Sequence, residues 1–269
     1  MNDSTDNSDN FSEQDYSDAT ASDGFGFVKH NPTDFESFKK FQENMNSRYS
    51  KFEAEKAKRE IILNIAKWEE MLPPRWSTAI LTKITQPADK AAKRIIEILE
   101  NNPESSLYIH GNSGAGKTYL AYATLRRFIG KNWVSPGQIK IISEEALMGL
   151  AASGFQGQDR FNELLKSKYK VYFFDGVANR PSYSQKEQQL WEQLIDHIYS
   201  KSLNVIFTSN KDLTVFSAHL SDSADSKLHH LLNGKNVYVE SRSAEELKTF
   251  NNDSDLAKEK NQYDLFGNE

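Results

Sequence analysis

A glycine-rich segment at residues 111–118 has the composition and spacing of a phosphate-binding loop. Its sequence, GNSGAGKT, fits the pattern G-x-x-x-x-G-K-[ST] without a mismatch. Glycines let backbone N–H groups turn toward one anion, and the amino end of a following helix adds partial positive charge. Lys117 is expected to neutralise the β- and γ-phosphates of ATP or a close relative, and Thr118 to ligate Mg²⁺. The predicted cofactor-binding residues are Gly111, Asn112, Ser113, Gly114, Ala115, Gly116, Lys117 and Thr118.

Two later polar residues follow apolar runs that read as buried strands. Residues 171–174 are Val-Tyr-Phe-Phe and lead to Asp175, whereas residues 205–209 lead to Asn210. Parallel strands deliver their carboxyl ends to the sheet edge at which a phosphate loop lies. Asp175 is therefore expected to hold Mg²⁺ with Thr118, directly or through water, and Asn210 to contact the γ-phosphate or orient the attacking water. The alternatives are an aspartate that caps a turn and an asparagine that forms one.

Alternating helices and strands must position these residues. One predicted helix begins with a capping box of Ser184 and Glu187. The other helices are predicted at 89–100, 117–129, 144–152, 160–166 and 225–232, and the strands at 106–110, 138–142, 170–174, 203–208 and 236–239. Strands separated by helices predict an α/β fold, with a parallel sheet flanked by helices on both faces.

The amino-terminal part differs in composition. Residues 1–30 are acidic and nearly free of aliphatic side chains, which predicts a disordered tail. Residues 31–72 then form a helical arm that begins with a Thr33–Glu36 capping box, and the polar stretch 53–60 interrupts its apolar stripe. The arm reads either as a helical pair packed on its own domain or as an aromatic-rich arm that docks on a partner.

Composition excludes several other classes of site. The chain of 269 residues has no cysteine, which excludes disulfides and thiolate metal sites. No apolar run approaches the roughly 18–20 residues that a membrane helix needs. The acidic, polar amino terminus is unlike a signal or transit peptide. We therefore expect a cytoplasmic protein without a membrane segment.

The series of motifs resembles the AAA+ helicase loaders of the DnaC/DnaI type and their relative, the IstB transposition helper. Supporting matches are Leu-Pro-Pro-Arg-Trp at 72–76, Ile-Ile-Ser at 141–143, the segment 161–166, and Asp-Ser-Lys-Leu at 225–228, where the family has the helix that carries its arginine finger. The resemblance covers roughly residues 60–240. It implies an AAA+ P-loop NTPase core at 73–247 without a carboxyl-terminal lid domain, and Asp175, Asn210 and Lys227 as catalytic residues.

Two departures from the family pattern affect the expected activity. Gly176 stands where the family usually has Glu or Asp to activate water, and the finger position holds a lysine. Lysine lacks the planar fork of arginine, and finger residues are worth roughly 10³–10⁵ in turnover. We therefore expect nucleotide binding with slow or absent hydrolysis. Glu187 could substitute as base, although its capping role is favoured.

The segment 248–269 is predicted to be a flexible tail. It contains Gln262, Leu265 and Phe266, which resemble the peptide by which bacterial replication proteins dock on the sliding clamp. Leu265 and Phe266 could fill an apolar pocket while Gln262 forms a hydrogen bond. The alternative is that the Leu-Phe pair folds back on the domain.

The resemblance implies a replication accessory protein, most simply a loader of the replicative DNA helicase onto single-stranded DNA. The arm at 31–72 would grip the helicase, and copies of the chain could assemble as a homo-oligomer. Alternatives are a clamp-tethered regulator of initiation similar to Hda, an IstB-like helper, and a small-molecule P-loop kinase. Weak candidates for contacts to single-stranded DNA are Lys166, Lys168, Lys170, Arg126 and Arg127.

Overall fold

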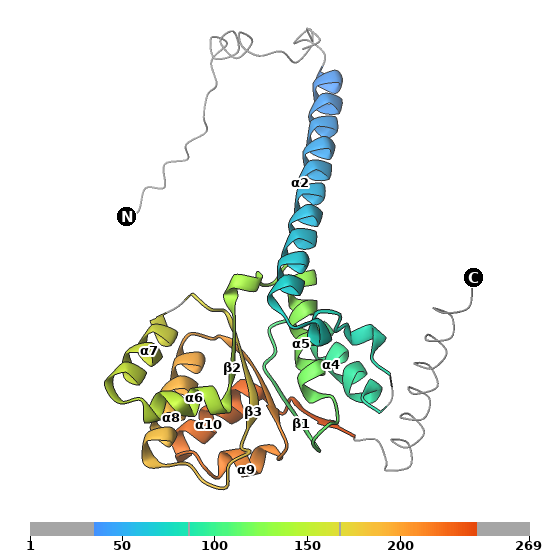
Figure 1. Cartoon of the computed structure of the whole chain (residues 1–269). Helices are drawn as coiled ribbons and strands as arrows, with labels where there is room; N and C mark the ends of the chain where they lie inside the picture. Colours follow the sequence, from blue (N-terminus) through green and yellow to red (C-terminus); the bar gives the residue numbers. More distant parts are fainter. Residues whose placement is uncertain (1–34, 86, 167, 241–269) are drawn as a thin grey trace, which may run out of the picture. The chain divides into compact units, whose positions relative to one another are not determined.

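The computed structural model describes residues 35–85, 87–166 and 168–240 (Figure 1). Its internal contacts divide the chain into two units, Met1–Glu55 and Lys56–Glu269. The predicted disordered tail, the capping residue Thr33 and the carboxyl-terminal peptide lie outside the described residues. None of the helices in those ranges is long and apolar enough to span a membrane.

A single helix, α2 (Phe35–Met71), runs through 37 residues from the first unit into the second. The helical pair, one of the two readings of this arm, is therefore wrong, because the helix continues through residues 53–60. The stretch consists of Glu, Ala, Lys and Arg, which are strong helix formers, so its polarity changes the exposed surface without breaking the helix. Within the second unit, Trp68 of α2 is buried.

The second unit is built on a parallel sheet of five strands in the order β2-β3-β4-β1-β5. The strands are β1 (Leu107–Gly111), β2 (Ile139–Ser143), β3 (Val171–Val177), β4 (Asn204–Ser209) and β5 (Asn236–Val239). β1 pairs in parallel with both β4 and β5, and β3 pairs in parallel with both β2 and β4. The predicted parallel sheet is confirmed; four strands differ from their predicted bounds by one to three residues at an end, and β5 has the predicted bounds.

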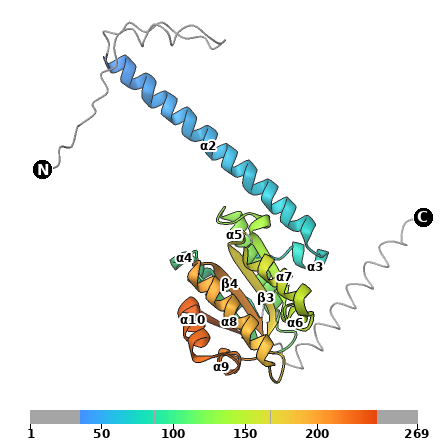
Figure 2. The ribbon, with the colours of Figure 1, turned by 90° about the vertical axis from the view of Figure 1, so that its left-hand side faces the viewer.

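Helices cover both faces of this sheet, as Figures 1 and 2 show. One apolar cluster joins α4 (Asp89–Asn101) and α5 (Lys117–Gly130) to strand side chains that include Ile109 and Phe173. The other cluster joins the opposite side chains, such as Tyr108 and Phe174, to the remaining long helices. Those helices are α6 (Glu144–Ala152), α7 (Gly154–Lys166), α8 (Gln185–Ser200) and α10 (Asp222–Leu232). Successive strand residues therefore face different cores, which explains why the central strands β3 and β4 contain continuous apolar runs.

Four short elements complete the second unit. They are α3 (Pro74–Ser77), η1 (Leu81–Lys83), η2 (Pro136–Gln138) and α9 (Leu213–Ser217). The sequence predicted none of them, because elements of three to five residues are too short to show a hydrophobic period. In α3 the ring of Trp76 stacks on Tyr122 of α5, with 5.3 Å between the ring centroids.

Candidate nucleotide site

The predicted phosphate loop connects β1 to α5, so the expected order of strand, loop and helix is present. β1 ends at Gly111 and α5 begins at Lys117. Gly114 and Gly116 have φ values of 78° and 93°, a region in which a Cβ is strained. This is the backbone geometry that lets a loop wrap its N–H groups around an anion.

Lys117 is a buried cation whose hydrogen-bond partners are both neutral. Its side chain amino group donates to the carbonyl of Asn112 at 2.7 Å and to Oδ1 of Asn210 at 2.8 Å. No carboxylate of the described residues lies within salt-bridge distance of it. Burial lowers the pKa of Lys117, and the charge of Asp175 only partly opposes this effect. A phosphate group would supply the missing negative charge, so these residues fit a nucleotide.

Asp175 lies directly opposite Thr118. Its Oδ1 accepts hydrogen bonds from the hydroxyl of Thr118 at 2.9 Å and from the hydroxyl of Thr208 at 2.5 Å. The structure thus brings together the two residues that the sequence predicted as Mg²⁺ ligands. Asn210 lies at the same site, because its Oδ1 accepts a hydrogen bond from Lys117, the neighbour of Thr118 in the chain. Thr208 was missed, although it stands two residues before Asn210 in the polar end of β4.

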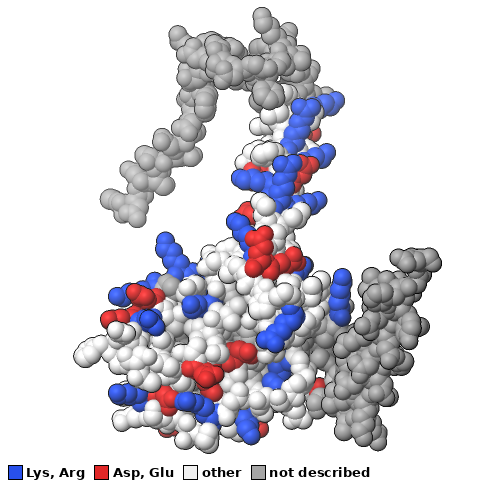
Figure 3. Space-filling view, viewed as in Figure 1, with Lys and Arg blue, Asp and Glu red and all other residues white. Residues whose placement is uncertain are grey.

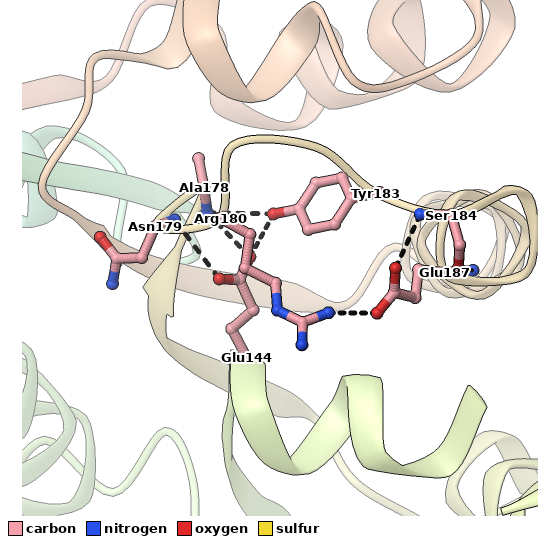
Figure 4. Close-up of polar contacts among 7 residues, drawn as sticks. All are labelled: Glu144, Ala178, Asn179, Arg180, Tyr183, Ser184 and Glu187. Carbon is pink, nitrogen blue, oxygen red and sulfur yellow. Dashed lines mark hydrogen bonds and ion pairs between the residues drawn. The ribbon is translucent and has the colours of Figure 1, made fainter. Parts of the chain in front are cut away.

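Two residues that the sequence did not indicate, Glu144 and Asn179, contact the segment at and after the end of β3. Gly176 has a φ of 80°, and a Cβ at this position would lie 3.0 Å from Nδ2 of Asn179. The backbone N–H groups of Ala178 and Asn179 donate to the carboxylate of Glu144, which is 4% exposed (Figure 4). In the sequence Glu144 is indistinguishable from an ordinary exposed acid in the first turn of a helix.

Glu187 fills its predicted structural role. It forms a capping box with Ser184 at the start of α8 and an ion pair with Arg180 (Figure 4). Burial raises the pKa of Glu187, but the hydrogen bonds from Ser184 and the charge of Arg180 outweigh it and hold the pKa below its usual value. The capping box is confirmed, and a carboxylate engaged in this way is poorly placed to act as a base.

Three of the other basic candidates form ion pairs within the chain. Lys227 of α10 forms an ion pair with Asp196 of α8. Arg126 forms an ion pair with Glu69, and Arg127 pairs with Glu100 at 3.2 Å. Lys168 and Lys170 are exposed and precede the amino end of β3, at the sheet edge opposite Asp175. Lys166, the last residue of α7, is also exposed. On the face of the second unit in Figure 3, basic and acidic side chains are interspersed. A role of these residues in DNA contact stays a prediction.

The comparison that decides the family covers most of the second unit. A family model described as novel STAND NTPase 3 matches residues 88–250, which is more than half of the chain. The chain belongs to the novel STAND NTPase 3 family. The matched range includes the phosphate loop, Asp175, Asn210 and the helix that carries Lys227, so this second unit is a STAND-type P-loop NTPase domain. No curated protein sequence matches the chain significantly.

Solved structures place the STAND NTPase domain in the AAA+ fold. The crystal structure of DnaI matches with a TM-score of 0.50 and 20% identity over 64% of this chain and 93% of that chain. The crystal structure of the DnaC helicase loader gives a TM-score of 0.49 and 21% identity over 62% and 100%. AMPPCP-bound DnaA from Aquifex aeolicus gives a TM-score of 0.48 and 19% identity over 63% and 51%. At these identities the likeness to DnaI establishes the fold alone.

Proposed function

We propose that this STAND NTPase binds ATP with Mg²⁺ and acts as a nucleotide-controlled accessory protein of DNA replication. The observation that carries the nucleotide site is the pairing of Thr118 with Asp175, beside a buried Lys117 that forms no ion pair with any of the described residues. Lys117 would contact the β- and γ-phosphates, and the Thr118 hydroxyl and the Asp175 carboxylate would hold the cation together with phosphate oxygens. Asn210, which now fixes Lys117, is placed to contact the γ-phosphate.

Titration of the full chain with a fluorescent ATP analogue tests this site. We expect saturable, Mg²⁺-dependent binding that Lys117→Ala weakens by at least tenfold. Lys90→Ala is the matched control, because Lys90 is a lysine whose side chain is 74% exposed and paired only with Glu240. No binding by the wild-type chain at millimolar nucleotide, or equal affinity for both variants, would refute the proposed site.

The more specific role that we propose is loading of the replicative DNA helicase. Its support is the resemblance of the motif series to DnaC/DnaI-type loaders, together with the fold shared with DnaI. Within the first unit, Met45, Tyr49 and Phe52 are 49%, 68% and 63% exposed, at spacings that place them along one side of α2. Such a stripe suits docking into an apolar groove of a partner. ATP would favour one state of the complex and thereby control release of the helicase.

Co-purification with the replicative helicase tests the loader proposal. We expect capture by the full chain, and loss of capture when Met45, Tyr49 and Phe52 are replaced by serine. Replacing the exposed Lys51 and Glu55 by alanine is the control on the same helix. Capture of the sliding clamp or of the initiator in place of the helicase would refute loading and favour a clamp-tethered regulator, and the nucleotide site would be unaffected by that outcome.

Hydrolysis is expected to be slow. Gly176 offers no side chain to activate water, and Lys227 is engaged with Asp196 of its own chain. A steady-state ATPase assay with and without single-stranded DNA measures the rate. Brisk turnover that survives Lys117→Ala would contradict the assignment of the site.

A further inference from the structure

The segment that follows Asp175 is held in an unusual conformation by a buried carboxylate. Ala178 has a φ of 58°, in a region that costs an L-residue about 1–2 kcal/mol. Its N–H donates to Oε1 of Glu144 at 2.9 Å, and the N–H of Asn179 donates to Oε2 at 3.3 Å. The Tyr183 hydroxyl donates to the same Oε1. One carboxylate thus fixes three positions of the loop (Figure 4).

Within the part of the chain that the structure describes, this anchor involves hydrogen-bond donors and no cation. Among the described residues, no basic side chain forms an ion pair with Glu144. The carboxylate instead lies in the first turn of α6, where the helix dipole favours negative charge. Burial and the contact with Glu144 raise the pKa of Tyr183, so its hydroxyl stays protonated and remains a donor. A buried carboxylate with this set of donors is costly to disturb.

The anchored loop places the amide of Asn179 over Gly176. Nδ2 of Asn179 donates to the carbonyl of Gly176 at 2.8 Å. Because a carbonyl can only accept, this bond fixes the amide with its nitrogen toward the backbone. In the described ranges no hydrogen bond is made to Asn179 Oδ1, which is therefore an acceptor without a donor, on an exposed residue.

Short contacts connect this amide to the predicted metal site. The N–H of Gly176 donates to the Thr208 hydroxyl at 3.0 Å, and that hydroxyl donates to Asp175, which also accepts from Thr118. A side chain at position 176 would project toward the Asn179 amide, since a Cβ there would lie 3.0 Å from Nδ2. Asn179 thus fills the space that a water-activating side chain at 176 would enter.

We propose that Asn179 orients the attacking water at this nucleotide site, and that Glu144 is the positioning residue that holds Asn179 there. The inference rests on the proposed nucleotide binding. Oδ1 accepts a hydrogen bond from the water, whose oxygen bonds to the γ-phosphorus while the bond to the β,γ-bridging oxygen breaks. ADP leaves with that electron pair. An amide cannot hold the proton of the water, which passes to a phosphate oxygen, so turnover is slow.

Single-turnover hydrolysis and nucleotide affinity, measured on the same preparations, test the inference. We expect Asn179→Ala to lower the hydrolysis rate about tenfold while the Kd for ATP stays within about twofold. Asn179→Asp loses the donor to the Gly176 carbonyl but supplies an acceptor that can also take the proton, so its rate falls at pH values below the pKa of the new carboxyl, a dependence that the wild-type chain lacks. Glu144→Gln presents an amide N–H₂ to the loop donors and should lower the rate as Asn179→Ala does.

The double variant Glu144→Gln/Asn179→Ala separates positioning from general damage. If Glu144 acts through Asn179, the double variant is no slower than Asn179→Ala alone. Glu145→Gln, an exposed neighbour on α6, is the control and should match the wild type. A wild-type chain that binds no ATP refutes the proposed function. Binding with no hydrolysis, or an unchanged rate in Asn179→Ala, overturns this inference and leaves nucleotide binding in place.

Discussion

Gly111 belongs both to the phosphate loop and to the pairing of β1 with β5. Replacing it should therefore destabilise the whole domain and not the loop alone. It pairs with Val239 of β5, and a Cβ on Gly111 would lie 2.3 Å from the Val239 carbonyl oxygen. Its φ of 152° is also unfavourable for an L-residue. Overpacking against backbone costs about 1–3 kcal/mol, and a strained backbone conformation costs about as much again. We therefore expect Gly111→Ala to lower the free energy of unfolding by about 4 kcal/mol.

Gly114→Ala provides the matched comparison in the same loop. Gly114 has a φ of 78°, but nothing lies within 4 Å of the position that its Cβ would take. Only the conformational cost of about 1–2 kcal/mol applies there. For a domain of this size 1 kcal/mol corresponds to roughly 2–4 °C in Tm. Thermal unfolding followed by circular dichroism without nucleotide should show a loss of about 8–16 °C for Gly111→Ala and a few degrees for Gly114→Ala. Equal losses would refute the close approach of β5.

Three further predictions concern stability. Because the fold depresses the pKa of Glu187, its stabilising contribution is complete above the usual glutamate pKa of about 4.3 and is lost as the pH falls through the lower value; Glu187→Gln should flatten this acid limb in unfolding curves measured across pH. On α7, Phe155 is 93% exposed and Phe161 is 0% exposed, so Phe155→Ser should change the unfolding free energy by less than about 0.5 kcal/mol and Phe161→Ala should lower it by about 3–5 kcal/mol in urea titrations. Thr208→Val leaves the Gly176 N–H without its acceptor and removes a donor to Asp175, and should cost about 1–3 kcal/mol in the same assay; no loss would contradict the hydrogen bonds described for Thr208.

The meeting of Lys117, Thr118 and Asp175 could be predicted because few local rules determine it. A phosphate loop follows its strand, and parallel strands end at one edge, so an aspartate after an apolar run must arrive beside the loop. This inference does not need the exact register or ends of the strands. It holds although β3 continues to Val177, beyond the predicted end at residue 174. The roles of the three residues toward nucleotide stay predictions.

Glu144 and Asn179 could not be predicted, because their importance depends on a contact between separate segments. The bonds from the Ala178 and Asn179 N–H groups to Glu144 span 34 and 35 positions of the chain. Nothing in the residue types distinguishes a buried acid at a helix start from an exposed one. The helical pair failed for another reason: the apolar stripe is interrupted at 53–60, but the residues there have high helix propensity, so the helix continues through them.

The strand order has a consequence for how this protein is made. β1 lies between β4 and β5, so neither neighbour of the strand that leads into Lys117 exists when that strand leaves the ribosome. Gly111 and Val239, which pair, are 128 positions apart (239 minus 111). At a synthesis rate of about 5–20 residues per second, the time between translation of Gly111 and translation of Val239 is roughly 6–26 s. Until β4 (Asn204–Ser209) has been translated β1 has neither neighbour, and until β5 follows one edge of β1 stays unpaired and open to other nascent chains.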